Sequence, residues 1–202
     1  GKYVWFRTSV ALALIFFLLG VLFEDEKRKE YARKILRVLK TPLGIAVTAF
    51  AAIFVLAGIL GLRPSYSFWS NFERGEGGLQ IIHLFLYFFL LAVLFVEEKH
   101  WRTLFWVATW SALLVVLYGV AAGLGYSGFV GSDMKFGDAG LRFQGSIGNP
   151  AYVAAYLIFS AFYATYLLFT RYRKHLIGTI SSWMLWLMLL AYAGAILLAA
   201  TR

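Results

Sequence analysis

Stretches of about twenty apolar residues recur along this 202-residue chain and constrain its fold more than any other feature. Each is long enough to cross the hydrocarbon core of a bilayer as a helix, and 61% of the chain is hydrophobic whereas only 14% is charged. Within a bilayer a helix satisfies its own backbone N–H and C=O groups. We therefore predict an all-α fold, a single polytopic transmembrane bundle of about six spans. The expected spans cover residues 4–23, 43–62, 79–96, 103–125, 150–170 and 177–200.

The segments between the spans predict how the chain is oriented. Segments 24–42, 97–102 and 171–176 carry twelve Lys and Arg residues, whereas segments 63–78 and 126–149 carry four. Because short cytoplasmic loops are enriched in Lys and Arg, we expect the first set in the cytoplasm and the second set outside. The net charge of +9 is then explained by membrane orientation and does not indicate nucleic-acid binding.

The charged segment 24–40 is expected to form a short interfacial helix. Its acids come first and its bases dominate the end, which matches a helix macrodipole. Apolar residues at three- and four-residue spacing give it a partial apolar face. A charged run of this kind is usually a solvated connector and a topology signal. In the preceding span, Arg7 is expected to extend its side chain to the interface.

Residues 141–150 close a polar loop and open the fifth apolar run. Asn149 is a good N-cap, and Pro150 fits the first turn of a helix. The free N–H groups and the dipole of this helix start, together with Arg142, predict a seat for an anion such as phosphate. The alternative is a capped helix start with a surface arginine that pairs with Asp138 or extends to the headgroups.

The predicted orientation places several polar residues together at the outer membrane face. Arginine stays charged and can bind phosphate oxygens bidentately, and charged groups at a membrane boundary need partners. A lipid-linked pyrophosphate would suit such a cluster, with its head at the interface and its tail in the bilayer. The candidate binding residues are Arg74, Arg142, Gly148, Asn149 and Arg202, with Glu73 and His83 as supporting residues.

These candidates also have structural explanations. Arg74 can form an ion pair with Glu73 or Glu76. His83 can be a hydrogen-bonded histidine between helices, and Arg202 can be a cation at the end of a helix. The pattern by itself therefore assigns no catalytic residue.

The sequence predicts neither a metal nor a cofactor. The absence of cysteine excludes disulfides and thiolate chemistry. The three histidines are far apart, with His83 expected outside and His100 and His175 expected on cytoplasmic loops. The chain also lacks a Gly-rich loop followed by Lys and Ser or Thr, so ATP-driven work is not indicated.

Three motifs, in this order, resemble those of the O-antigen ligase and O-antigen polymerase superfamily. Ser67-Phe-Trp-Ser-Asn-Phe-Glu-Arg-Gly-Glu-Gly, followed by His83, resembles the Trp…Glu-Arg-x-x-Gly loop of bacterial members. Arg142-x-x-Gly145-x-x-Gly148-Asn149-Pro150 resembles the superfamily signature at the start of a span. Leu198-Ala-Ala-Thr201-Arg202 resembles the start of a Thr/Ser-Arg-Gly-Ala segment. The resemblance covers roughly residues 60–202, and Ala151 stands where the family usually has Asn.

The resemblance implies a multi-pass glycosyltransferase of the GT-C type in the bacterial inner membrane. Such enzymes transfer a glycan from undecaprenyl pyrophosphate to a glycan, lipid or protein acceptor, without a metal. By the resemblance, Arg142 and Arg202 would hold the pyrophosphate and stabilise the leaving group, with Arg74 as a supporting contact. The family's catalytic histidine lies in a large periplasmic loop, expected beyond the last residue here. The chain is therefore expected to be a fragment that is inactive by itself.

Two other classes of membrane protein remain open from the sequence. A transporter or flippase-like carrier would show broken spans in two related halves. Pro42 and Pro150 lie at span starts, Pro64 lies in a loop, and no internal symmetry is visible. A scaffold without catalysis would be favoured if Arg142 and Arg74 were fully paired with nearby acids.

Overall fold

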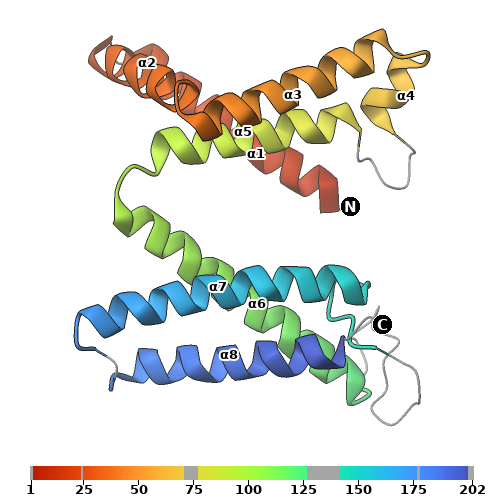
Figure 1. The fold of residues 1–202 in the computed structure, drawn as a ribbon, viewed down its shortest axis with the longest axis vertical. Helices are drawn as coiled ribbons and strands as arrows, with labels where there is room; N and C mark the ends of the chain where they lie inside the picture. Colours follow the sequence, from red (N-terminus) through yellow and green to blue (C-terminus); the bar gives the residue numbers. More distant parts are fainter. Residues whose placement is uncertain (1, 24, 71–76, 127–141, 177, 200–202) are drawn as a thin grey trace. The chain divides into compact units, whose positions relative to one another are not determined.

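The computed structural model describes residues 2–23, 25–70, 77–126, 142–176 and 178–199. These residues form eight α-helices and no strand (Figure 1). The chain divides into two compact units, unit 1 (Gly1–Val96) and unit 2 (Glu97–Arg202). Unit 1 contains α1 (Lys2–Phe23), α2 (Asp25–Leu39), α3 (Pro42–Leu60), α4 (Pro64–Trp69) and α5 (Gly78–Leu94), and unit 2 contains α6 (Glu98–Gly123), α7 (Pro150–Arg173) and α8 (Ile180–Leu198).

Five of the helices, α1, α3, α6, α7 and α8, are long and apolar enough to cross a membrane. They confirm the prediction of an all-helical, multi-pass membrane protein. The helix α5 is apolar but has 17 residues, so its length of about 26 Å falls short of a hydrocarbon core of about 30 Å. A sixth span at this helix therefore stays a prediction. The helix α6 begins five residues before the expected span, and its Glu98 lies favourably in the first turn.

The segment 63–78, expected to be a loop, contains the short helix α4. Pro64 occupies its first turn, where the missing N–H costs nothing. The Ser67 hydroxyl donates a hydrogen bond to the Arg63 carbonyl over 3.3 Å. The apolar pattern did not indicate this helix because six residues are too few to show helical periodicity.

In unit 1, α5 is the central helix, since it contacts α1, α2, α3 and α4. It is joined to α1 by a hydrogen bond between Arg7 and Gln80 and by Phe6, which packs edge-on against Tyr87 with ring centroids 5.7 Å apart. The segment 25–39 is helical as expected, and this helix, α2, contacts α1, α3 and α5.

The Arg7–Gln80 contact corrects the expectation that Arg7 simply extends to the interface. The Arg7 Nε donates a hydrogen bond to the Gln80 Oε1 over 3.0 Å, and the pair is partly buried. Polar side chains that bond across helices help to hold them together in lipid. The sequence contains both residues, but their separation of 73 positions gives no sign of the pairing.

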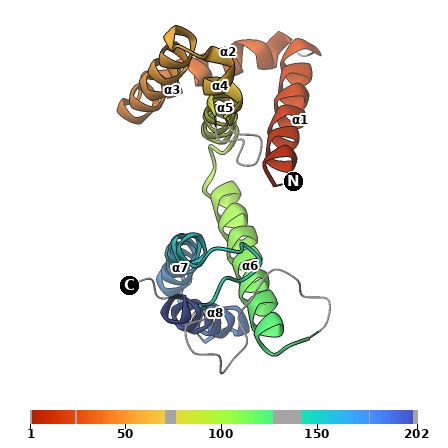
Figure 2. The ribbon, with the colours of Figure 1, turned by 90° about the vertical axis from the view of Figure 1, so that its right-hand side faces the viewer.

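Unit 2 is a bundle of three helices in which α7 packs against both α6 and α8, and α6 also contacts α8 (Figure 2). Its core contains the fully buried side chains of Leu157, Leu167, Leu185 and Tyr192. The helices α6 and α8 are joined by a hydrogen bond from the Tyr192 hydroxyl to the Thr109 carbonyl, at 2.5 Å. This bond satisfies the one polar atom of a large buried side chain.

We expect Tyr192→Phe to lower the free energy of unfolding by about 1 kcal/mol, the usual contribution of a hydrogen bond between membrane helices. The matched control is Tyr152→Phe, because the Tyr152 side chain is 63% exposed and loses the same atom. Unfolding of the full chain in a denaturing detergent series measures both. Equal stability of the two variants would contradict a stabilising role for the Tyr192 hydroxyl.

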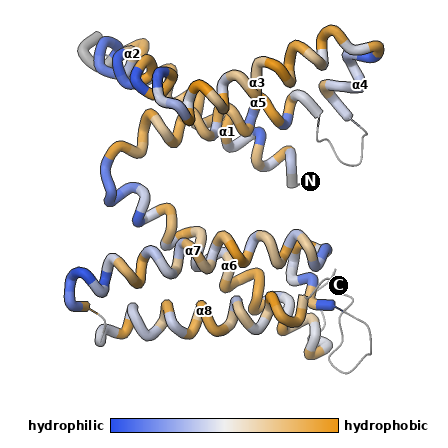
Figure 3. The backbone as a smooth tube through the Cα atoms, in the orientation of Figure 1, coloured by the Kyte–Doolittle hydropathy of each residue, from blue (hydrophilic) through white to orange (hydrophobic). Residues whose placement is uncertain are grey.

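The α7–α8 turn gathers basic residues and is stabilised by one of them (Figure 3). The Arg171 Nε donates to the Ser182 Oγ over 3.1 Å, and its Nη2 donates to the Thr179 Oγ1 over 3.0 Å. Ser182 is fully buried. Arg171, expected only as a charge in a cytoplasmic loop, therefore also holds the end of α7 against the start of α8.

Candidate functional site

The segment 142–149, here called the strap, leads into α7 and is anchored in the core of unit 2. Phe143 is fully buried and belongs to the same hydrophobic cluster as Val116, Val153 and Leu157. Its backbone N–H donates a hydrogen bond to the Leu198 carbonyl, at 3.1 Å, near the C-terminal end of α8. The strap therefore joins the start of α7 to the end of α8.

Two glycines allow the strap to lie directly on α6. Gly145 has a φ of +54°, which favours glycine, and a Cβ at this position would lie 2.9 Å from the Val115 Cγ1. A Cβ on Gly119 of α6 would overlap the ring of Phe143 and lie 2.9 Å from the Gly145 Cα. A side chain on Gly119 would therefore displace Phe143 or the backbone of the strap.

Asn149 caps α7, as the sequence predicted. Its Oδ1 accepts hydrogen bonds from the N–H groups of Ala151, at 2.9 Å, and Tyr152, at 3.4 Å. The Val153 N–H donates to the Asn149 carbonyl, and Pro150 has no N–H. The expectation of free N–H groups at this helix start is thus wrong for these residues. An anion bound here would depend on the helix dipole and on side chains outside the helix.

Gly148 completes the turn that leads into the cap. It has a φ of +82°, in the left-handed region that favours glycine. Its N–H donates a hydrogen bond to the Gln144 carbonyl over 3.1 Å. In the structure Gly148 and Asn149 therefore shape the backbone between the anchored Phe143 and the first turn of α7.

Arg142 is exposed and lies directly before the buried Phe143. Among the residues that the structure describes, none forms a hydrogen bond or an ion pair with its side chain. Asp138, the acid that could pair with it, lies outside the described residues. The anchored neighbour fixes the backbone of Arg142 beside the end of α8, and no described residue occupies its guanidinium group.

His83 lies in α5, in unit 1, and is half-buried. Its Nδ1 is 2.7 Å from the Leu79 carbonyl, one turn earlier in the same helix. Because a carbonyl only accepts, the Nδ1 carries the proton in this bond. His83 is one turn from Gln80, the acceptor of the Arg7 hydrogen bond. The Nδ1 of His83 thus bonds within its own helix, rather than to a neighbouring helix as the structural alternative supposed.

The remaining candidates, Glu73, Arg74 and Arg202, lie outside the described residues. The structure brings together Arg142, Gly148 and Asn149, all on the strap of unit 2. The sequence did not lead us to predict that Phe143 is buried in the core of unit 2. The signal that could have indicated it is a single aromatic residue between Arg142 and two glycines.

The described part of the chain holds no group of three or more His, Asp or Glu side chains that could ligate a metal. Comparisons of the chain with models of protein families, with curated proteins and with solved structures find no match. The described residues thus form a helical membrane protein in which an exposed arginine, Arg142, lies on the anchored strap.

Proposed function

We propose that this chain is part of a membrane glycosyltransferase of the O-antigen ligase and polymerase type. In this proposal, Arg142 binds the pyrophosphate of an undecaprenyl-linked glycan donor at the outer face of the inner membrane. The observation that carries the proposal is the position of Arg142. It is exposed, and it directly precedes a fully buried residue that joins the α7 start to the α8 end.

The anchored backbone supports this role energetically. Because Phe143 holds the chain at Arg142, binding a ligand has to order one side chain rather than a mobile loop, which reduces the entropic cost. A guanidinium group presents its donors in a planar fork that matches two phosphate oxygens. The positive end of the α7 dipole also favours a negative ligand at this end of the helix.

The proposal assigns a second arginine, Arg202, to the same pyrophosphate. Leu198 accepts the hydrogen bond from the strap, and Arg202 follows four positions later in the sequence. Four residues span at most about 14 Å, so Arg202 can reach the pyrophosphate proposed at Arg142. Two arginines would neutralise the charge that develops on the leaving pyrophosphate as the glycosidic bond breaks. Arg74 would add a supporting contact.

If Arg142 has a purely structural role, its replacement should leave the affinity for the glycan donor unchanged. A cation near the C-terminal end of a helix interacts favourably with its dipole, and such a role needs no ligand. A carrier that moves the same lipid without catalysis would also bind the pyrophosphate. Binding therefore tests the site, and glycan transfer by a chain that carries the complete catalytic apparatus tests the reaction.

We expect Arg142→Ala to weaken binding of an undecaprenyl-pyrophosphate-linked glycan about ten- to a hundredfold. Hydrogen bonds to charged groups contribute about 1.5–3 kcal/mol each, which corresponds to this range. Arg142→Lys keeps the charge but loses the fork, so its affinity should lie between those of the parent and Arg142→Ala. The measurement is a titration of the full chain in nanodiscs.

Arg63→Ala is the matched control, because Arg63 is another exposed arginine that the predicted orientation places at the same face. Its affinity should equal that of the parent. Unchanged affinity in Arg142→Ala, or the same loss in both variants, would overturn the proposed donor site and leave Arg142 as a structural cation.

A further inference from the structure

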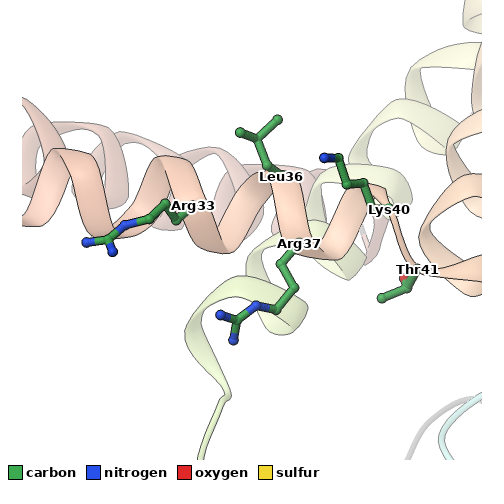
Figure 4. Close-up of a pocket in the computed structure, with 5 residues that line it drawn as sticks. All are labelled: Arg33, Leu36, Arg37, Lys40 and Thr41. Carbon is green, nitrogen blue, oxygen red and sulfur yellow. The ribbon is translucent and has the colours of Figure 1, made fainter.

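A second charged surface, at the opposite end of the sequence, forms a pocket on α2 (Figure 4). The pocket has a volume of about 540 Å³, and we call it the basic groove. Its lining consists of three cations, one leucine and one threonine: Arg33, Leu36, Arg37, Lys40 and Thr41.

The spacing of these residues places them on one face of α2. Positions 33, 36, 37 and 40 fall within an arc of about 100° on a helix with 3.6 residues per turn. Arg33 and Arg37 extend to the same side from successive turns, and Leu36 and Lys40 extend to the other side (Figure 4). The Leu36 side chain is 55% exposed and extends to the same side as Lys40 (Figure 4). The groove thus combines a pair of guanidinium groups with an exposed apolar side chain.

The cations of the basic groove are not neutralised by the described acids. The neighbouring Lys34 is paired with Glu30 at 2.7 Å and lies over the Tyr31 ring. By contrast, no carboxylate among the described residues contacts Arg33, Arg37 or Lys40. Arg33 donates only a 3.3 Å hydrogen bond to the Lys29 carbonyl. These charges are therefore available to an anion.

The basic groove directly precedes a candidate membrane span in the sequence, which places it at a membrane boundary. Thr41 caps α3, accepting a 3.0 Å hydrogen bond from the Gly44 N–H. The helix α3, which begins at Pro42, is one of the five that are long and apolar enough to cross a membrane. Lys40 is thus two residues from a candidate span, at the level where lipid phosphates surround the hydrocarbon core.

We propose that the basic groove binds the phosphate of an anionic phospholipid in the adjacent leaflet. Arg33 and Arg37 donate to the phosphate oxygens, Lys40 adds a third positive charge, and Leu36 contacts the upper part of an acyl chain. Clusters of Lys and Arg beside a membrane helix attract anionic lipids in this way. The exposed Leu36 favours a lipid over free phosphate, since a small ion would gain nothing from it. This proposal is independent of the donor site at Arg142.

The test compares two triple variants of the full chain that lose the same charge from the same helix. One is Arg33→Gln, Arg37→Gln and Lys40→Gln, in the groove. The other, the control, is Arg28→Gln, Lys29→Gln and Lys34→Gln. Binding of phosphatidylglycerol, with phosphatidylcholine of the same acyl chains as the reference, is measured by native mass spectrometry in detergent at physiological ionic strength.

The groove variant should lose affinity for phosphatidylglycerol on the order of a hundredfold, because each basic residue near an anionic lipid contributes roughly fivefold. The control should lose about twofold or less, since its charges act only through screened, longer-range attraction. Circular dichroism shows whether helix content is retained. If the triple variant does not fold, Arg33→Gln and Arg37→Gln singly should each weaken binding by roughly fivefold.

Three results would overturn the proposal. Equal losses in both triple variants would mean that diffuse charge, rather than a site, attracts the lipid. Unchanged lipid binding in the groove variant would leave α2 as a topology signal. Displacement of phosphatidylglycerol by an equal concentration of inorganic phosphate would show that the groove binds the free ion and not the lipid.

Discussion

Replacing Phe143 by alanine is expected to lower the free energy of unfolding by about 3 kcal/mol, the lower end of the range for buried aromatic truncations. The ring is fully buried in the core of unit 2, so its removal leaves a cavity. The lower end applies because lipid already solvates apolar surface, and the loss is mainly one of packing contacts. Thermal unfolding of the full chain in detergent measures the change.

The matched control is Phe159→Ala on α7. That side chain is 61% exposed, so the same atoms are removed without a cavity, and stability should change by about 0.5 kcal/mol or less. Hydrogen exchange at the Phe143 N–H adds a local readout, because this group bonds to the Leu198 carbonyl and should exchange faster in the position-143 variant. Equal effects of both substitutions on stability would contradict an anchoring role for Phe143.

Phe143→Ala also links stability to the proposed function. If the anchor holds Arg142 in place, donor binding should weaken even though the arginine is intact, since its backbone is no longer fixed. Phe143→Leu, which keeps much of the volume, should retain most of the affinity. Full affinity in Phe143→Ala, with faster exchange at the strap, would show that Arg142 does not depend on the anchor.

Gly119→Val is expected to lower the free energy of unfolding by about 2–3 kcal/mol through overpacking. A Cβ at this position would overlap the Phe143 ring, and a backbone atom of Gly145 lies 2.9 Å away. The Phe143 ring is fully buried in the core and the Gly145 atom is backbone, so the strap itself has to shift. Gly194→Val in α8 is the control, because a Cβ there has no atom within 4 Å, and it should be nearly neutral.

A double-mutant cycle tests whether the strain arises at Phe143. Combining Gly119→Val with Phe143→Ala should cost less than the sum of the two single effects, with a coupling of about 0.5–3 kcal/mol for residues in contact. The smaller side chain at position 143 would make room for the valine. Additive effects would place the strain elsewhere, and a neutral Gly119→Val would contradict the close approach of α6 and the strap.

The cap of α7 was predictable because its signal is local. Asn149 and Pro150 are neighbours in the sequence, and the hydrogen bonds of the Asn149 side chain reach only two and three residues ahead. The occupied N–H groups were not predicted, although they follow from the same cap. A capping side chain accepts hydrogen bonds from the same N–H groups that an anion would otherwise bind. The Asn149-Pro150 pattern therefore predicted both a helix cap and an anion site, but the N–H groups of Ala151 and Tyr152 can serve only one of them.

The helix contacts were not predictable because the membrane helices are apolar on nearly every side. In a soluble protein an apolar stripe shows which face is buried, but in lipid the exposed faces are apolar as well. The Tyr192–Thr109 and Arg7–Gln80 hydrogen bonds join residues 83 and 73 positions apart. The contact between Gly119 and Phe143 likewise depends on how the strap folds back over α6.

By itself, the sequence determined that this chain forms helices long and apolar enough to span a membrane, because a helix in lipid must satisfy its backbone within one segment. It also determined the cap of α7 and the helical, basic character of α2, which depend on neighbouring residues. Only the tertiary structure decided that Phe143 anchors the strap at the end of α8 and leaves Arg142 exposed. That choice depends on close packing between distant segments, for which the spacing of residues along the chain carries no signal.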